Sequence, residues 1–172
     1  TTMKTYSLQL ADNQLITYQD RKRHLWLLSM LYPLLALSGV GLYLVTGSQW
    51  LLLTPLVSIY GGASLFDWLL GIDKSNPPEE LVPQLEEDPY YRWLPMLTVP
   101  LHVVVLVVIA GFTATHDLSW LSMLVLALTA GLYSGLAINT AHELGHKKTE
   151  LERRLARIAA GISLYGHFCI EH

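Results

Sequence analysis

This sequence contains few charged residues and a single cysteine, and its amino-terminal segment is polar. Charged residues make up only 15% of the 172 residues, whereas 52% are apolar and the mean hydropathy is positive. Because the apolar residues are bunched into long runs, this composition argues against a soluble domain. The net charge of −3 gives no reason to expect a nucleic-acid partner, and the single cysteine, Cys169, excludes an internal disulfide. The first 20 residues lack an apolar core, so we expect no cleavable signal peptide.

Four apolar runs are long enough to cross a bilayer, which takes about 20 residues. The runs are residues 25–45, 50–72, 93–114 and 118–141. Backbone groups inside a bilayer must satisfy their own hydrogen bonds, so each run is predicted to be a helix. Short connections at 46–49 and 115–117 pair the runs into two helical hairpins. The predicted fold is all-α, a polytopic bundle of four transmembrane helices with a membrane-proximal cytoplasmic helix.

Lysine and arginine fall on only one side of these runs. All eleven lie before the first run, between the second and third, or after the fourth, and neither short connection contains one. The positive-inside rule therefore predicts that the amino terminus and the carboxy-terminal segment are both cytoplasmic. We expect the protein to be integral to the cell's inner membrane, in contact with lipid.

Two segments outside the runs are expected to be ordered, and residues 1–172 are treated as part of one transmembrane catalytic domain. Residues 73–92 are predicted to be a cytoplasmic connector along the membrane, because prolines followed by Glu79 and Glu80 favour a helix start. Within it, Asp88-Pro89 is expected to interrupt the chain. Residues 150–172 are predicted to form a helix packed under the bilayer, since their apolar part is short for a crossing. A tilted or re-entrant helix is the alternative.

Two histidines stand one helical turn apart at the end of the fourth run. At about 1.5 Å per residue, a helix from residue 118 uses up the hydrocarbon core of about 30 Å near residue 138. His142 and His146 therefore emerge at the cytoplasmic rim, on one helical face, where they can share a metal centre. The same letters fit the H-E-x-x-H pattern of zinc proteases, in which Glu143 would be the general base. Alternatively, Glu143 forms a helical ion pair with Lys147.

A further histidine-bearing segment is Gly166-His167-Phe168-Cys169-Ile170-Glu171-His172, and its last residue, His172, comes 30 residues after His142. A chain that returns beneath the membrane would bring His172 back to His142. Zinc proteases need no such segment, whereas histidine-rich di-iron membrane oxygenases collect short histidine clusters from separate segments. Imidazole suits iron, zinc and copper, so the ligand type alone does not select the metal.

The sequence resembles the integral-membrane alkane 1-monooxygenases, the alkane omega-hydroxylases of the histidine-rich di-iron family. The stretches that carry the resemblance are residues 18–26, 76–92, and N-T-A-H-E-L-G-H-K-K (139–148) with Y-G-H-F-C-I-E-H (165–172). The resemblance covers nearly the whole chain and implies an amino-terminal portion. It implies that His142, His146 and His172 are iron ligands and that His167 is not a ligand. The family's remaining ligands come later in its sequences, so this stretch alone is expected to be inactive.

The resemblance implies terminal hydroxylation of linear alkanes at a site with two iron ions. Molecular oxygen would be the co-substrate, and electrons would come from rubredoxin, which NADH reduces through rubredoxin reductase. Three alternatives stay open at this point: a membrane fatty-acid desaturase or hydroxylase, an intramembrane zinc metalloprotease, and a non-enzymatic membrane metal carrier.

Other residues are candidates for supporting roles. Outer-shell partners of the ligands are expected among Asp67, Asn139, Glu143 and His167; Asp67 could instead snorkel to the membrane surface. His102, inside the third run, is either functional or hydrogen-bonded to a neighbouring helix.

A substrate tunnel and a docking surface are also predicted. Leu132 and Gly135 share a helical face with the histidines, which is either a tunnel wall or a close-packed seam. Ile59 and Gly62 would add to such a tunnel, with bulk at Ile59 limiting the alkane length. The basic residues after the fourth run either anchor the protein at lipid headgroups or dock rubredoxin. They are Lys147, Lys148, Arg153, Arg154 and Arg157.

Overall fold

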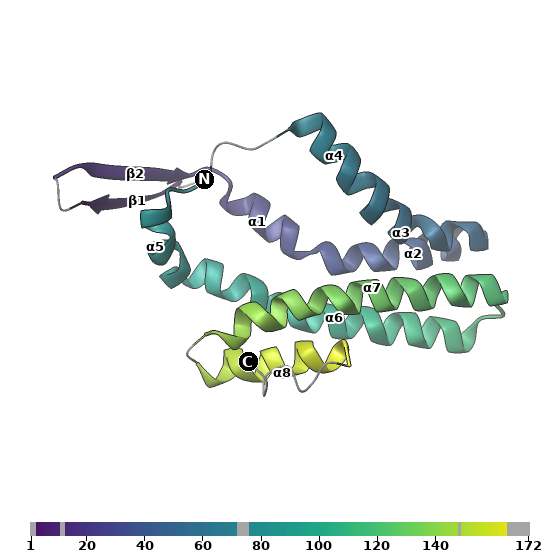
Figure 1. Cartoon of the computed structure of the whole chain (residues 1–172). Helices are drawn as coiled ribbons and strands as arrows, with labels where there is room; N and C mark the ends of the chain where they lie inside the picture. The colour runs from purple at the N-terminus through teal and green to yellow at the C-terminus, as the bar shows by residue number, and fades with distance from the viewer. Residues whose placement is uncertain (1–2, 11–12, 72–75, 148, 165–172) are drawn as a thin grey trace.

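Two long antiparallel helices form the centre of the molecule. The computed structural model describes residues 3–10, 13–71, 76–147 and 149–164. Helices α6 (Pro89–Thr115) and α7 (Trp120–Gly145) run side by side over their lengths (Figure 1). The end that carries the loops at 47–48 and 116–119 is called the loop end. The opposite end, where α7 finishes with His142 and His146, is called the histidine end.

Three helical stretches of the described residues are long and apolar enough to cross a membrane: Gln49–Leu69, Pro89–Thr115 and Trp120–Gly145. A fourth apolar stretch, Tyr32–Thr46, is shorter. These helices confirm the predicted all-α membrane bundle. The first predicted run, 25–45, corresponds to the short stretch and the helix before it, so a fourth full crossing stays a prediction.

Proline breaks the first predicted run into pieces. The chain forms α1 (Arg23–Met30), the 3-10 helix η1 (Tyr32–Leu37) and α2 (Ser38–Thr46) in succession. Pro33 lies in the first turn of η1, where its missing N–H removes a bond from the α-helical ladder. Apolar length predicts a span but does not reveal where its hydrogen-bond pattern changes.

The second predicted run is also segmented. It consists of the 3-10 helix η2 (Gln49–Leu53), α3 (Thr54–Val57), the π-helical turn η3 (Ser58–Gly62) and α4 (Ala63–Leu70). Pro55 lies in the first turn of α3, and Gly61 and Gly62 end η3. Turns of the π-helical kind occur frequently at functional sites. Beyond η3, α4 diverges from α6 and α7 (Figure 1).

Asp88 separates two helices, as the sequence predicts, and together with Pro89 it also starts the second of them, α6. After the connector helices η4 (Glu79–Leu81) and α5 (Val82–Glu87), the Asp88 side chain accepts a hydrogen bond from the Tyr90 backbone N–H at 3.0 Å. Pro89 occupies the first helical turn, where a missing N–H costs nothing. The third predicted run therefore gains four residues at its beginning.

A β-hairpin precedes the helices, and the all-α prediction did not include it. Strands β1 (Lys4–Gln9) and β2 (Leu15–Asp20) pair antiparallel, with Tyr6 opposite Tyr18. Asn13 adopts a left-handed φ of 64° between them, as turns require. The sequence signal was the alternation of polar and apolar residues on both sides of Asn13, which is typical of paired strands.

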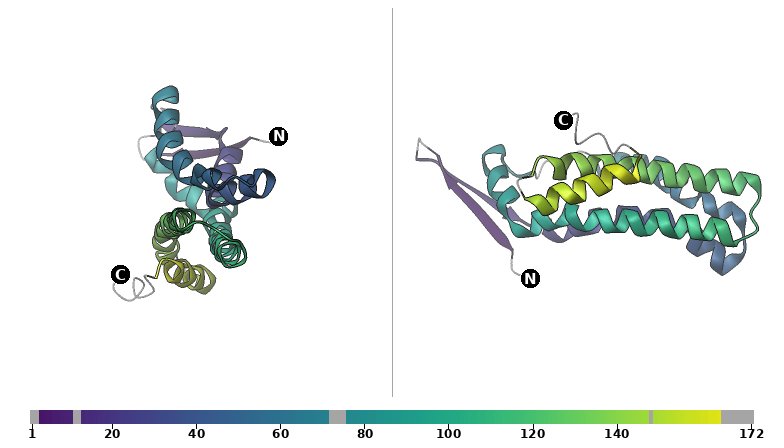
Figure 2. Two further views of the ribbon diagram at one scale, coloured as in Figure 1. Left: turned by 90° about the vertical axis from the view of Figure 1, so that its right-hand side faces the viewer. Right: turned by 90° about the horizontal axis from the view of Figure 1, so that it is seen from below.

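Helix α8 (Glu150–Ile162) folds back antiparallel to α7 and packs on α6 and α7 (Figure 2). Its alanine face allows a close approach between helices. The residues of this contact are Met96, Val99, Ala141, Leu144, Ala156, Ala159 and Ala160. This direction is the one that the re-entrant alternative requires, and the depth of α8 in a membrane stays a prediction.

A second apolar core lies toward the loop end. It joins η1, α2 and η2 to α6 and α7, and Ile59 and Leu132 pack against it while partly buried. Its buried members are Ala36, Val40, Leu52, Val105, Ile109, Phe112, Val125, Leu126 and Tyr133.

Candidate metal centre

The two histidines of α7 lie beside each other at the histidine end. Their ring centroids are 4.6 Å apart, with the ring planes at 77°. Both residues are exposed, and His146 caps the carboxy-terminal end of the helix. One helical turn of spacing thus presents two imidazoles on the same surface, as the sequence predicts. Neighbouring imidazoles suit part of a donor set for iron, zinc or copper.

The rest of the donor set is not found among the described residues. Within 3–10, 13–71, 76–147 and 149–164, no group of three or more histidine, cysteine, aspartate or glutamate side chains is arranged to hold a metal ion. His172 and His167 lie outside this part of the chain. The metal centre therefore stays a prediction. Two adjacent imidazoles fit it, but they do not complete its donor set.

Asp67 is not brought to the histidines. It is exposed on α4, which diverges from α7 (Figure 1). Asn139 is exposed on α7, three residues before His142. The role of both as outer-shell partners stays a prediction, and only Asn139 has the placement for it.

His102 is buried at 2% exposure in α6. Its Nε2 lies 2.8 Å from the Tyr32 hydroxyl of η1, and the two rings meet edge to face. Of its two predicted roles, the hydrogen bond to a neighbouring helix is the one that the structure contains.

The face of α7 that leads to the histidines is open in the described part of the chain. Gly135, Asn139, His142 and His146 are exposed, and a Cβ atom added at Gly135 would meet nothing within 4 Å. A close-packed seam against a described helix is therefore not what this face forms. A Cβ atom added at Gly62 would likewise meet nothing within 4 Å, whereas Ile59 and Leu132 lie on the loop-end core.

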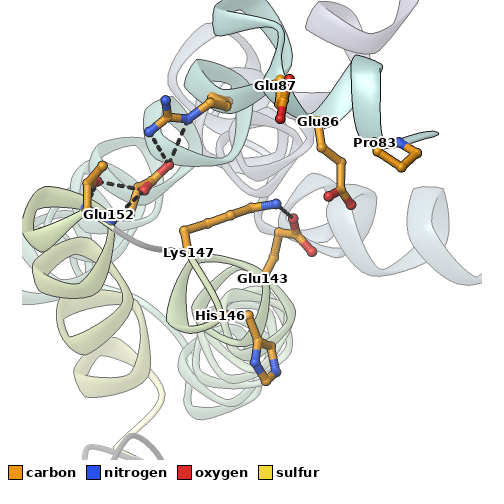
Figure 3. Close-up of a pocket in the computed structure, with 9 residues that line it drawn as sticks. Pro83, Glu86, Glu87, Glu143, His146, Lys147 and Glu152 are labelled. Carbon is orange, nitrogen blue, oxygen red and sulfur yellow. Dashed lines mark hydrogen bonds and ion pairs between the residues drawn. The ribbon is translucent and has the colours of Figure 1, made fainter. Parts of the chain in front are cut away.

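Glu143 forms the ion pair that its spacing predicts. Its Oε1 lies 2.9 Å from Lys147 Nζ, and this hydrogen bond raises the pKa of Lys147. In Figure 3 the His146 ring points away from this pair. The geometry does not favour Glu143 as the general base of a zinc protease, because that role requires a carboxylate next to the metal ligands.

A pocket of about 570 Å³ lies beside His146, between α5, α6 and the start of α8 (Figure 3). It is lined by Pro83, Glu86, Glu87, Arg92, Glu143, His146, Lys147, Thr149 and Glu152. Acidic and basic side chains are mixed on its walls, so the surface next to the histidines is not uniformly basic.

The arginines of the predicted docking surface share one partner. Arg153, Arg154 and Arg157 lie 3.6, 3.1 and 3.0 Å from the carboxylate of Glu150. The hydrogen bond from Arg154 lowers the pKa of Glu150. Exposed pairs of this kind contribute little to stability, so the arginines keep access to a partner or to lipid. Lys148 lies outside the described residues.

Sequence reasoning missed a buried ionic network at the same end. Asp88 accepts hydrogen bonds from Arg23 at 2.7 and 3.2 Å, from Lys4 at 2.8 Å and from the Tyr6 hydroxyl. The Arg23 guanidinium holds the pKa of Asp88 well below its usual range, although burial opposes this shift. Arg23 also stacks on the Tyr90 ring, 4.1 Å from its centroid. These contacts fasten the β-hairpin and α1 to the start of α6.

Comparison with known proteins supplies the family. No protein-family model matches the chain. It is 48% identical over 164 residues to alkane 1-monooxygenase 1 of Alcanivorax borkumensis, and 46% and 43% identical over 157 residues to the alkane 1-monooxygenases of Ectopseudomonas oleovorans and Pseudomonas putida. These matches cover 94%, 90% and 90% of this chain but 40%, 39% and 39% of the relatives, so the chain spans about two fifths of their length. The chain is a membrane protein that is homologous, over nearly its whole length, to the alkane 1-monooxygenases.

Proposed function

We propose that this chain is part of an enzyme that hydroxylates the terminal carbon of linear alkanes, with oxygen as the co-substrate. The observation that carries the proposal is the identity of up to 48% to proteins named alkane 1-monooxygenase. That identity extends over the segment that ends α7 with two adjacent imidazoles. A membrane bundle also suits a substrate that dissolves in the bilayer.

His142 and His146 are proposed to contribute to a di-iron centre together with His172. Iron bound there would supply the activation of oxygen. The chain's own contribution is to hold two imidazoles one turn apart at the end of a long helix, with Asn139 one turn before them. Such support orients ligands and affects their affinity for a metal.

The substrate is proposed to lie along the open face of α7. Gly135 leaves room on this face, and Leu132 and Ile59 meet the same core nearer the loop end. Ile59 sits in the π-helical turn, so its side chain is placed by a local irregularity rather than by a regular helix. We infer that bulk at Ile59 limits the alkane length. The product profile of Ile59→Trp tests this, and an unchanged longest substrate contradicts it.

We propose that the protein spans the inner membrane with its histidine end on the cytoplasmic side. The described lysines and arginines gather toward this end, and the loops at 47–48 and 116–119 contain none. Electrons from rubredoxin would arrive from this side, with Lys147, Lys148, Arg153, Arg154 and Arg157 as candidate contacts. Reversing the charge of Arg153 and Arg154 should slow reduction by rubredoxin while alkane binding is kept; unchanged kinetics contradict that role.

The decisive experiment measures iron content and 1-alkanol formation in the intact protein in membranes. His142→Ala and His146→Ala should each lose bound iron and product, because each removes a ligand. His116→Ala is the matched control, since His116 lies at the loop end and stacks on Phe112 at 4.2 Å. Alanine variants that keep both iron and product contradict the proposal, and one bound zinc with no alcohol product points instead to the protease alternative.

A further inference from the structure

Arg92 and Glu152 join α6 to α8 through a buried carboxylate. Arg92 lies in the first turn of α6, and its Nε and Nη2 donate to Glu152 Oε1 at 3.2 and 3.1 Å (Figure 3). The Glu152 side chain is only 1% exposed, whereas that of Arg92 is 41% exposed. A buried carboxylate needs such a partner, because burial without one is costly.

The other oxygen of the same carboxylate caps α8. Glu152 Oε2 accepts hydrogen bonds from the Thr149 backbone N–H at 3.2 Å and from its hydroxyl at 2.6 Å. Thr149 Oγ1 in turn accepts from the Glu152 backbone N–H at 3.3 Å, which completes a capping box. Burial raises the pKa of Glu152, but the bonds from Thr149 and Arg92 outweigh it, so the pKa lies below its ordinary value.

Glu152 follows the histidine pair closely along the chain. His146 ends α7 and Thr149 begins α8, with two lysines between them. Farther along α8, its alanine face packs on Ala141 and Leu144, which neighbour His142 and Glu143 in α7. A shift of the start of α8 would therefore disturb the last turns of α7 and residues 146–147, which follow them.

We propose that the Arg92–Glu152 ion pair positions His146 against His142 by locking the turn that leaves α7 to the first turn of α6. Both residues act through this turn and neither touches the metal, so they are positioning residues. The inference deepens the proposed function and depends on it for the identity of the metal.

The structural role and the positioning role can be separated by two variants. Arg92→Met leaves a buried carboxylate without its cation, which destabilises the fold whatever the ion pair positions. Adding Glu152→Gln removes that charge, and glutamine at the same place still completes the capping box with Thr149. The double variant should therefore regain most of the lost melting temperature while the link to α6 stays weakened.

The test uses the intact protein in lipid nanodiscs, with and without ferrous iron. In the metal-free protein, amide hydrogen exchange at 146–152 should be faster in both variants than in the wild type. Iron affinity should fall by about tenfold in the double variant, the usual scale for losing an outer-shell support. Arg153→Met is the matched control, because Arg153 is exposed on the same helix and pairs only at the surface. It should change neither readout.

Two results would overturn the inference. A double variant with wild-type iron affinity would show that the ion pair only stabilises the fold, and wild-type exchange at 146–152 would show that it does not hold the turn. If the wild-type protein itself binds no iron, the proposed function fails, and the exchange measurement on the metal-free protein still decides whether Arg92 holds the turn.

Discussion

The histidine end and the loop end are held together by different kinds of contact. At the histidine end, two carboxylates that are almost fully buried, Asp88 and Glu152, each meet an arginine from another helix. At the loop end, Gln49 joins the two loops through neutral hydrogen bonds, at 3.0 Å from the Ser119 N–H and 2.6 Å from the Ser122 hydroxyl.

The difference follows from what each contact requires. A buried ion pair tolerates few geometries, because misalignment leaves an uncompensated charge. The stabilisation from neutral hydrogen bonds and apolar packing falls more gradually as the groups move apart. The buried ionic contacts therefore stand at the same end as the histidine pair. At the loop end, the backbone of α2 at Gly39 packs closely against Leu52 of η2 instead.

The largest effect is expected from Arg23→Met, which removes the best-aligned partner of Asp88. The side chain of Asp88 is 3% exposed, so losing this guanidinium should cost about 3 kcal/mol in the free energy of unfolding. Lys4→Met is the matched control, because Lys4 Nζ binds the same carboxylate from a side chain that is 48% exposed, and its loss should cost under about 1 kcal/mol. Chemical unfolding in detergent micelles measures both, and equal costs would show that burial does not distinguish the two cations.

A smaller effect is expected at the loop end from Gly39→Ala. The new Cβ would lie 3.0 Å from Leu52 Cα, Leu52 O and Pro55 Cδ, so α2 must move away from η2. Overpacking of this kind costs about 1–3 kcal/mol. Gly41→Ala, two residues on, meets nothing within 4 Å and should be neutral or slightly stabilising. If both variants unfold like the wild type, the close approach of α2 and η2 is not tight in solution.

The smallest effect is a pH dependence that belongs to the histidine end. Burial, and then the hydrogen bond to Asp88, raise the pKa of Tyr6 to about 12. Because the folded pKa is raised, the stability that Tyr6 contributes is complete below pH about 10 and is lost as the pH rises through about 12. The free energy of unfolding, measured between pH 9 and 12, should fall more steeply with rising pH in the wild type than in Tyr6→Phe. Parallel curves would show that the phenol does not titrate with folding.

Local patterns in the sequence predicted the features that are themselves local. Helix spacing placed His142 and His146 on one surface and paired Glu143 with Lys147, and apolar length located the runs that became α6 and α7. Partners far along the chain carry no such signal. Arg92 meets Glu152 across 60 residues, and nothing in either neighbourhood specifies the other.

The start of α6 at Pro89, four residues before the predicted run, has a physical reason as well. Asp-Pro can end one element or begin the next, since an N-cap carboxylate and a proline in the first turn suit a helix start equally well. Asp88 does both here, because it follows the last residue of α5 and its side chain caps α6. The π-helical turn at η3 was hidden in the same way, because an apolar run with two glycines fits a regular helix on composition alone.

The distance along the chain between Arg23 and Asp88 determines when the two residues can first meet during biosynthesis. The two residues are 65 positions apart, so at roughly 5–20 residues per second a ribosome needs about 3–13 seconds to deliver the carboxylate after the guanidinium. Until then Arg23 can meet Asp20 and the Tyr6 hydroxyl, which lie 3.7 and 3.1 Å from its guanidinium in the finished structure. The β-hairpin can therefore dock on the start of α6 only after Asp88 has been synthesised, and its docking would report that the nascent protein has reached that stage.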